Sequence, residues 1–440
     1  MRSRFVSLDR HVALECEWDR PDRYREIHAL RADQKYIPRG AGLSYVAASF
    51  SDRACSIDLT RFNHILDFNS EEQWIKVEAG ISLGELFDFL SPRGLQLAVM
   101  PGHPQITVGG CIAGNVHGKN QFREGEFRAF VREIQLFHPD HGEISASPSV
   151  NPEVFDLTCG GFGLTGIIIA ATLALSRLPG NAVRVQHFPV GGLDEAFREV
   201  ARRKEEFDLL YGWCNLSAWS RWSGSGFITA GNIETDSEAG DSSSLKYSQL
   251  NPSSSRRWRP RVFRPGTLPL VNAVYLGMNL LQRAPHRMPL SQFLFPAVGK
   301  EFYFDYYGDK GFIEMQVLVP SAAAEEFVRE FTRVVRGAEG LIGLTTVKAS
   351  RGKQRLLHYT GTGFNFTVDV ANTAAGLDLL GQLDVLNTRH GGITNIIKDS
   401  RLSSDVARQQ FTEFDEFHER LLAFDPARRF VSAVSERLAL

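Results

Sequence analysis

One stretch decides the fold: residues 101–120, which run Pro-Gly-His-Pro-Gln-Ile-Thr-Val-Gly-Gly-Cys-Ile-Ala-Gly-Asn-Val-His-Gly-Lys-Asn. It places Gly102, Gly109, Gly110 and Gly114 among small side chains and ends in a His-Gly-Lys triplet. Glycine accepts positive φ and exposes backbone N–H groups, so a pyrophosphate can approach this backbone closely. A glycine-rich turn between two strands is the alternative that the stretch alone leaves open.

Two further glycine loops lie on either side of this stretch in the chain. Residues 36–45 run Tyr-Ile-Pro-Arg-Gly-Ala-Gly-Leu-Ser-Tyr, and residues 159–166 run Cys-Gly-Gly-Phe-Gly-Leu-Thr-Gly. The later loop contains G-x-G-x-x-G, but a Rossmann site needs a strand before that motif and a helix after it. Here a short helix led by Pro152 precedes the motif and a β-branched strand, 167–175, follows it. The three loops therefore predict a dinucleotide site of another kind.

Length and composition restrict the class of protein. A chain of 440 residues with 43% hydrophobic residues predicts two globular domains. The formal charge of −2 argues against nucleic acid as a partner, because such a partner requires a basic surface. Five cysteines without C-x-x-C spacing predict a reducing compartment and no metal site.

The sequence predicts a cytoplasmic protein. Residues 1–6 lack the apolar region of a secretory signal, and no apolar run reaches the length of a membrane span. Residues 256–281 join a basic-aromatic run to an apolar run. They either rest on the inner membrane as a peripheral contact or form a helix packed inside the domain. The Ser-rich acidic stretch 236–244 before them predicts a flexible loop.

Periodicity predicts how the chain is organised. Residues 1–180 alternate short strands with short helices, including a helix opened by a capping box of Ser82 and Glu85. After residue 180, longer strands combine with two long helices near 322–336 and 373–390. We expect one domain over 1–180, a second over 181–392, and a segment 393–440 that returns to the first.

The strands of the second domain have polar and apolar faces. In strand 312–319 Glu314 and Gln316 share one face, and in strand 364–370 Asn365, Thr367 and Asp369 do so. Lys348 falls on the same kind of face in strand 344–349. Helices that bear Phe327, Phe331 and Leu379 can cover the apolar faces. The polar faces are either a solvated sheet surface or a polar roof over a cofactor.

The order of these motifs resembles a known family. R-G-x-G-x-S at 39–44, the quoted stretch, and G-G-x-G-L-T-G-I-I at 160–168 are similar to the FAD-binding domain of the vanillyl-alcohol-oxidase (PCMH-type) flavoproteins. Within that class, Gly-Gly-Ile-Thr-Asn-Ile-Ile-Lys-Asp-Ser-Arg at 391–401 resembles the decaprenylphosphoryl-ribose oxidase family, over almost the whole chain. The resemblance implies an α+β fold in which a PCMH-type FAD-binding domain joins an antiparallel-sheet substrate domain with covering helices.

The resemblance also implies the site. The residues expected to bind FAD are Arg39, Gly40, Ala41, Gly42, Leu43, Ser44, Tyr45, Gly102, Thr107, Val108, Gly109, Gly110, Gly114, Asn115, Val116, His117, Ile167 and Asn395. Those expected to contact substrate are Tyr45, Glu314, Gln316, Lys348, Asn365, Thr367 and Lys398. Because Leu43 stands where some members carry a flavin-linking histidine, we expect noncovalent FAD.

Two residues are expected to be catalytic, Lys398 and His117. Oxidation of an alcohol leaves negative charge on the reduced flavin, and a fixed cation such as Lys398 would stabilise it. His117, in the glycine segment, would orient the ring or relay a proton. A solvated surface position is the competing interpretation for an isolated lysine.

Three positions depart from the family pattern. Thr367 replaces a cysteine, so thiol-directed inhibitors of the family should form no adduct here. Glu314 replaces a pocket glutamine, and we expected Leu294 to replace a pocket tyrosine. The identity of the sugar and of its lipid carrier therefore stays open.

The resemblance implies oxidation of a secondary hydroxyl, the ribose 2′-OH of a polyprenyl-phosphoryl pentose, to a keto sugar. This would be the first half of an epimerisation to the arabinose form for cell-wall glycan precursors, and a short-chain reductase partner would complete it. A soluble alditol or aldonolactone oxidase that uses O2 is the first alternative. A flavin-binding scaffold without turnover is the second.

Overall fold

The N-terminal part of the chain builds two small sheets. In this computed structural model, residues 1–217, 223–235, 259–282 and 284–440 are described. A four-stranded sheet has the order β1 (Arg2–Val6), β2 (Ala13–Asp19), β4 (Cys55–Asp58), β3 (Tyr36–Arg39). A five-stranded antiparallel sheet has the order β5 (Ile65–Asn69), β6 (Trp74–Glu78), β10 (Ile167–Ala174), β8 (Val131–His138), β9 (Gly142–Ala146). The short strands β7 (Leu95–Gln96) and β11 (Ser176–Arg177) pair with each other.

Short helices pack on the five-stranded sheet and position the glycine loops. The helix α2 (Leu83–Leu90) begins at the predicted capping box, in which Ser82 and Glu85 bond each other's backbone N–H groups. Its apolar stripe and the helix α3 (Val108–Ala113) share one core with strands β6, β8 and β10. The helix α5 (Pro152–Thr158) precedes β10, so the third glycine loop runs from helix to strand, as the sequence predicted.

The second large element is an eight-stranded antiparallel sheet. Its strands, in spatial order, are β15 (His286–Pro289), β12 (Ala182–Val190), β14 (Gly226–Ile233), β13 (Leu209–Cys214), β17 (Ile342–Ser350), β18 (Gly363–Ala371), β16 (Phe312–Pro320) and β19 (Ile393–Thr394). The predicted strands of the second domain form its centre, β17-β18-β16. This confirms the predicted fold class, in which a large antiparallel sheet accompanies the flavin-type half.

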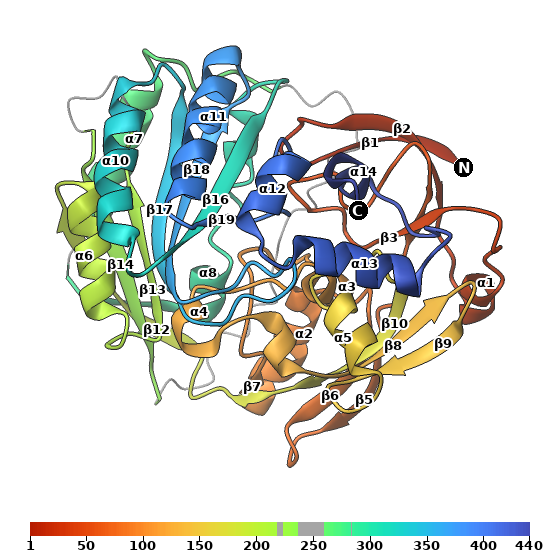
Figure 1. Ribbon diagram of the computed structural model, residues 1–440. Helices are drawn as coiled ribbons and strands as arrows, with labels where there is room; N and C mark the ends of the chain where they lie inside the picture. The colour runs from red at the N-terminus through yellow and green to blue at the C-terminus, as the bar shows by residue number, and fades with distance from the viewer. Residues whose placement is uncertain (218–222, 236–258, 283) are drawn as a thin grey trace.

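Three helices cover one face of this sheet (Figure 1): α6 (Leu193–Arg203), α10 (Ala324–Gly337) and α11 (Ala374–Arg389). Phe327, Phe331 and Leu379 pack with Met315 and Phe366 in one core, as the alternation of polar and apolar residues predicted. The covered face is therefore the apolar one. The opposite face of β16, β17 and β18 is left for the functional site.

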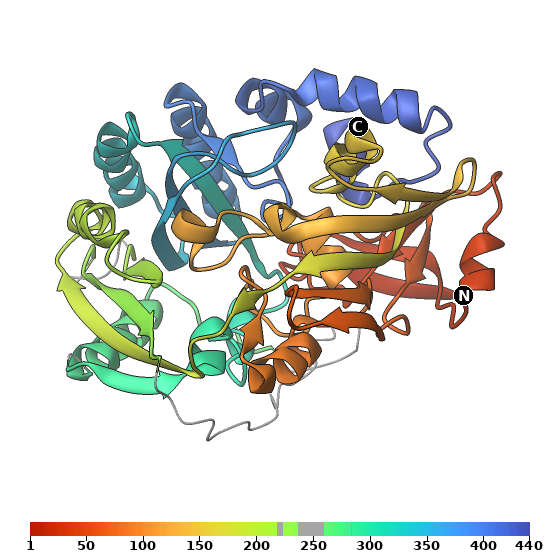
Figure 2. The same cartoon turned by 90° about the horizontal axis from the view of Figure 1, so that it is seen from below.

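The C-terminal segment connects the two halves. Its first strand, β19, pairs with β16 at the edge of the large sheet. The helices α12 (Ser404–Gln410) and α13 (Phe414–Phe424) then share a core with Ile37 and Leu157 of the N-terminal half. Figure 2 shows that these helices run from α11 of the large sheet, which α12 contacts, to α5 of the N-terminal half, which α13 contacts. The predicted domain boundaries remain a prediction.

The other helices are short, except α7. They are α1 (Tyr24–His28), α4 (Gln121–Glu124), α8 (Leu290–Leu294), α9 (Phe302–Asp305), α14 (Ala433–Leu438) and the 3-10 helices Ser91–Arg93 and Phe127–Phe130. Within the described ranges, no helix is long and apolar enough to cross a membrane.

The helix α7 (Leu268–Leu281) lies in the segment for which the sequence left two alternatives. It is packed on one side, where Leu268, Asn272 and Leu276 are buried. Its other side exposes large apolar side chains, namely Leu270, Val274, Tyr275, Met278 and Leu281. Residues 256–258, and the stretch 236–244 expected to be a loop, lie outside the described residues.

Candidate functional site

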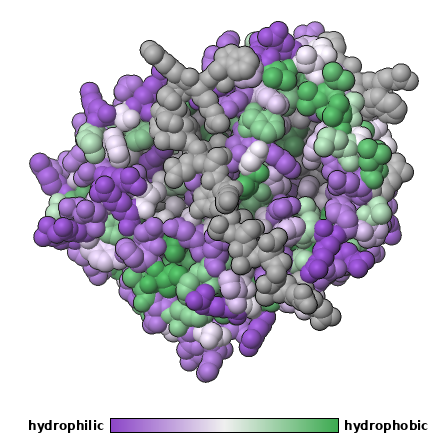
Figure 3. Space-filling model, turned by 180° about the vertical axis from the view of Figure 1, so that it is seen from behind, coloured by the Kyte–Doolittle hydropathy of each residue, from purple (hydrophilic) through white to green (hydrophobic). Residues whose placement is uncertain are grey.

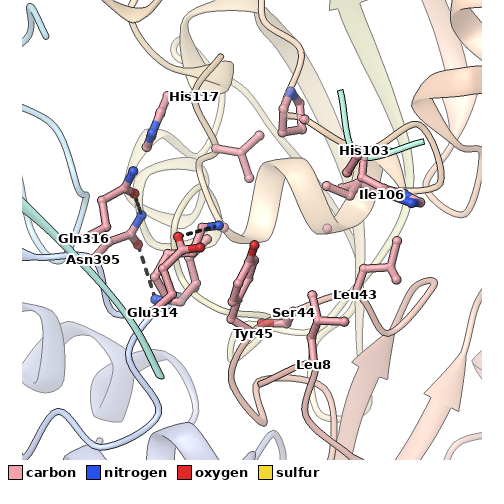
Figure 4. A pocket seen from close by; sticks show the side chains of 18 of the residues that line it. Leu8, Leu43, Ser44, Tyr45, His103, Ile106, His117, Glu314, Gln316 and Asn395 are labelled. Atoms are coloured by element: carbon pink, nitrogen blue, oxygen red, sulfur yellow. Dashed lines mark hydrogen bonds and ion pairs between the residues drawn. The ribbon is translucent and has the colours of Figure 1, made fainter. Parts of the chain in front are cut away.

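A cavity of about 710 Å³ lies between the glycine loops and the polar face of the large sheet (Figure 4). Residues from all three predicted loops line it, and so do residues of β16, β17 and β18. A volume of this size suits a cofactor or a drug-sized ligand, for which pockets of about 300–1,000 Å³ are typical.

The glycine loops are positioned by close backbone contacts. Thr107 caps α3 by accepting the N–H of Gly110, and Gly40 lies directly against the same threonine. A Cβ added to Gly40 would come within 2.2 Å of Thr107 Oγ1, so this approach requires glycine. Gly42 adopts φ +70°, a left-handed conformation that few other residues tolerate. These constraints place the loop 40–45 and the start of α3 on one wall of the cavity.

Several buried donors on that wall either make no hydrogen bond or lack a charged partner within the described part of the chain. Asn115 fixes its Oδ1 on the backbone N–H of Arg128, while its buried Nδ2 makes no hydrogen bond. His103 Nε2 is buried and equally unsatisfied. The Arg39 guanidinium is buried and bonds the Ser49 hydroxyl at 2.9 Å, with no carboxylate in ion-pair contact among the residues described. Buried donors of this kind usually have an acceptor, and the oxygens of a flavin dinucleotide fit them.

The polar face of the large sheet forms the opposite wall. Glu314, Gln316, Thr367 and Asp369 are buried and line the cavity. Gln316 Oε1 accepts from Asn395 Nδ2 at 2.7 Å (Figure 4). Its Nε2 donates to Thr367 Oγ1 at 3.2 Å. The interpretation as a solvated sheet surface is therefore wrong, because the N-terminal half covers this face.

Lys398 is held at the cavity wall by two groups. Its Nζ lies 2.9 Å from Glu314 Oε1 and 3.6 Å from the centre of the Tyr45 ring. Burial and the nearby charge of Glu314 raise the pKa of the Tyr45 hydroxyl well above the ordinary value. The lysine side chain stays 24% exposed, so the ammonium can be reached from the cavity. It is not the solvated surface lysine that the sequence left as an alternative.

Two more lysines and a histidine line the same cavity. Enclosure away from bulk water, together with the charge of Lys398, lowers the pKa of Lys348 to about 8. The same desolvation and the charge of Lys348 lower the pKa of Lys119 to about 7. Desolvation and the charges of Lys348 and Lys398 lower the pKa of His117 well below its usual value. His117 is therefore a neutral imidazole at neutral pH, able to accept a proton.

Most of the predicted site residues lie together. All those expected to bind FAD line the cavity except Val108 and Ile167, and all those expected to contact substrate line it except Asn365. Lys398 and His117 also line it. Their roles remain predictions, because position alone does not test them.

The three exceptions have simple physical reasons. Val108 is the first residue of α3 and points into the core beneath it. Ile167 points to the far side of β10, and alternation brings Ile168 to the cavity instead. The Asn365 amide is already hydrogen-bonded, because its Oδ1 accepts from the Tyr359 hydroxyl at 2.6 Å and its Nδ2 donates to Gln121 Oε1 at 2.8 Å.

Sequence reasoning also misplaced one residue and missed others. Leu294 packs in the N-terminal core, and only its carbonyl reaches toward the site, accepting from Lys119 Nζ at 2.6 Å. Lys119 belongs to the quoted glycine segment, and Asp369 shares the alternation of Thr367, so both had a signal. No local sequence pattern indicated the aromatic lining of the cavity. Its members include Trp213, Phe263, Tyr275, Phe302, Tyr303 and Tyr306.

One group of possible metal ligands lies outside the cavity. Ligand atoms of His138, Asp140 and Asp425 come within 4.8 Å of one another. His138 Nδ1 accepts the backbone N–H of Asp140, and the Asp140 carboxylate pairs with Arg429. These contacts account for the cluster as structure, and no metal role is assigned to it.

Comparisons with known proteins point to the same chemistry. A family model described as FAD binding domain matches residues 27–146. Over 425 residues, 92% of this chain and 89% of the relative, the chain is 27% identical to decaprenylphosphoryl-beta-D-ribose oxidase of Mycolicibacterium smegmatis.

Two other relatives match over different lengths. An uncharacterised protein in the mprA 5′ region of Streptomyces coelicolor is 24% identical over 82% of this chain and 100% of its own length. L-gulonolactone oxidase of Mus musculus is 30% identical over 34% of each chain. Together with the cavity and its unsatisfied donors, these matches indicate an FAD-linked oxidoreductase that is similar to the PCMH (vanillyl-alcohol-oxidase) type.

Proposed function

We propose that the protein oxidises a secondary hydroxyl, the ribose 2′-OH of a polyprenyl-phosphoryl pentose, to a ketone. The reaction would be the first half of an epimerisation to the arabinose form in cell-wall precursor synthesis. The likeness to the decaprenylphosphoryl-ribose oxidase supports this proposal because it extends over both halves of the chain. The likeness to L-gulonolactone oxidase covers only a third.

One observation carries the choice of a phosphate-bearing substrate. Lys119 and Lys348 line the cavity on the substrate side and have no carboxylate in salt-bridge contact within the described residues. Ammonium groups held away from water without a counter-ion are costly, and an incoming phosphate would supply one. A neutral lactone or alditol would leave both cations uncompensated.

The chain's own residues suit an alcohol oxidation. When bound, the flavin supplies the hydride acceptor. Lys398 would stabilise negative charge that develops on the substrate oxygen and on the cofactor. His117, neutral and lining the cavity, would orient the ring or accept a proton. Gln316, fixed between Asn395 and Thr367, would orient sugar hydroxyls.

We propose that FAD is bound without a covalent link. Leu43, at the position where some flavoproteins of this class carry the linking histidine, lines the cavity and offers no nucleophile. The neighbouring loop holds the cofactor through backbone and guanidinium donors instead.

Two partners follow from this function. A keto sugar must be reduced to complete an epimerisation, so a short-chain reductase would take over the product. The lipid carrier would leave the cavity past α7, where Tyr275 both lines the cavity and is exposed. Figure 3 shows apolar residues gathered where α7 lies, and we propose that α7 rests on the membrane there.

A lactone or alditol oxidase remains the second candidate, since L-gulonolactone oxidase is 30% identical over part of the chain. Anaerobic reduction of the bound flavin separates the two. Bleaching by a polyprenyl-phosphoryl pentose supports the proposed function, whereas bleaching by free lactones or alditols alone overturns it.

A further inference from the structure

Two carboxyl groups face each other beside the position expected for the substrate. Glu314 on β16 is the direct cross-strand partner of Asp369 on β18. Both side chains are buried, 4% and 1% exposed, and both line the cavity. Side chains directly opposite in an antiparallel pair lie about 5 Å apart at Cβ. Two ionised carboxylates at such a separation, away from water, repel each other strongly, so one of them holds a proton.

The hydrogen bonds indicate which carboxyl is neutral. Glu314 has the partner of an anion, because its Oε1 contacts the Lys398 ammonium at 2.9 Å. Asp369 Oδ2 accepts from the Tyr303 hydroxyl at 2.9 Å, but its buried Oδ1 has no partner among the described residues. If Asp369 Oδ1 carries a proton, it gains a partner, because it can then donate a hydrogen bond to Glu314. Burial and the charge of Glu314 also raise the pKa of Asp369 well above its usual value.

We propose that Glu314 is the proton acceptor for the substrate hydroxyl, and that Asp369, in its neutral form, is the residue that positions it. This inference rests on the proposed alcohol oxidation and adds to it the destination of the proton. It concerns a carboxylate that this chain carries where the family pattern has a glutamine. Lys398 keeps its proposed role and also pairs with Glu314. His117 keeps the role of orienting the ring, and Glu314 takes the proton of the hydroxyl in its place.

The step is balanced as follows. The O–H bond of the alcohol breaks and its proton goes to a Glu314 oxygen, while the C–H bond breaks and its hydrogen leaves with both electrons as hydride to oxidised flavin. The carbon and oxygen form the ketone. Loss of hydride makes the hydroxyl far more acidic, so a carboxylate of ordinary basicity suffices as acceptor. Lys398 keeps Glu314 ionised before the reaction.

The pH dependence of this pair depends on every charged or titratable group that faces it. These groups lie on the strands β17 and β18, on α9, and in the loops that face them. They are Tyr45, Tyr303, Tyr307, Lys348, Tyr359, Asp369 and Lys398. The phenols stay neutral because burial raises their pKa values well above 10. The phenols therefore add no charge near Glu314 around neutral pH.

The protonation of Asp369 can be tested without substrate. We expect the FAD-loaded protein at pH 7.5 to show the infrared C=O stretch of a protonated carboxyl, and D369N to remove it. D9N is the matched control: Asp9 is buried, but its pKa of about 6 leaves it ionised at pH 7.5. A spectrum that D369N leaves unchanged would overturn the neutral Asp369.

The role of Glu314 is tested by E314Q, which keeps the shape of the side chain. We expect normal FAD uptake and a rate of flavin reduction that falls by about 100-fold or more, the scale of a lost general base. D369L, which removes the donor to Glu314, should also slow flavin reduction while leaving FAD uptake normal. D369N, which keeps a donor at the same place, should restore most of the rate.

The outcomes distinguish this inference from the proposed function. If E314Q reduces flavin as fast as the wild type, Glu314 is not the acceptor, although the alcohol oxidation stands. If no polyprenyl-phosphoryl pentose reduces the wild-type flavin, the proposed function fails, while the infrared result still tests the carboxyl pair. If D369L reduces flavin as fast as the wild type, or if D369N is as slow as D369L, Asp369 does not position Glu314.

Discussion

Lys398 and Glu314 form an ion pair of 2.9 Å at the junction of the two halves of the protein. Glu314 lies on β16, the strand next to the edge of the large sheet, and Lys398 follows the edge strand β19 in the segment that leads to the C-terminal helices. The pair places a fixed cation and a fixed anion on the wall of a cavity lined by three glycine loops. An alcohol bound there would have a proton acceptor and a stabilising charge within reach.

Replacing Lys398 should separate cofactor binding from chemistry. We expect K398A to retain bound FAD and to lose reduction by substrate, by a factor of about 100 to 1,000, the scale of one lost stabilising donor. K353A is the control, since Lys353 is exposed and does not line the cavity. Stopped-flow reduction measures both, and undiminished reduction in K398A would remove Lys398 from the mechanism.

Substrate affinity should fall as pH rises. Lys119 and Lys348 have lowered pKa values of about 7 and about 8, so both ammonium charges are present well below pH 7 and absent well above pH 8. A phosphodiester keeps its charge over this range, so its Kd should increase about tenfold or more between pH 6 and pH 9, as expected for lost charge-assisted contacts.

Calorimetry gives a second measure of the same effect. At pH 8, binding a polyprenyl phosphodiester should take up protons, seen as a binding enthalpy that depends on the ionisation enthalpy of the buffer. K348M should reduce this uptake, and K353M should not. A Kd that is flat from pH 6 to pH 9, with no proton uptake, would contradict a phosphate contact by these lysines.

Flavin retention tests the noncovalent site. Acid precipitation should release free yellow cofactor into the supernatant, because Leu43 cannot form a covalent link. Colour that stays with the precipitated chain would show that another residue carries the flavin.

The packing at Gly40 predicts a loss of cofactor. G40A puts a Cβ within 2.2 Å of Thr107 Oγ1, so the two flavin loops must move apart. We expect lower FAD occupancy after purification, measured from the ratio of flavin to protein absorbance. G337A is the control, because a Cβ at Gly337 meets nothing within 4 Å. Equal occupancy in both variants would show that the close contact at Gly40 is not needed.

The exposed side of α7 can be tested with vesicles. We expect the protein to sediment with anionic liposomes and the double substitution V274E and M278E to abolish this. V385E is the control, since Val385 is 70% exposed on α11 at the opposite face of the large sheet. Binding that survives the double substitution, or that is absent in the wild type, would contradict a membrane contact through α7.

The sequence predicted the parts that depend on local rules. Ser82 and Glu85 cap α2, and the alternation in β16 and β18 assigned Met315 and Phe366 to the core and Glu314 and Thr367 to the other face. Capping boxes and period-two alternation are properties of neighbouring residues, so one chain suffices to recognise them.

The parts that failed depend on contacts between distant residues. Asn365 has the same alternation as Thr367, yet Gln121, 244 positions away, takes up its amide. Ile167 and Ile168 differ by one position, and the pairing of β10 decides which of them meets the cavity. The burial of the polar face by the N-terminal half also had no local signal. Without it, the solvated and the covered interpretations were equally consistent with the strands.

The central claim is that this cavity oxidises a phosphate-linked pentose with its bound flavin. The most direct measurement is the absorbance of the FAD-loaded protein mixed anaerobically with a polyprenyl-phosphoryl ribose, beside the free pentose, an alditol and a lactone. The account predicts that the phospholipid-linked sugar alone bleaches the flavin rapidly. Flavin that stays oxidised with that substrate, or that bleaches as fast with the free lactone, would contradict it.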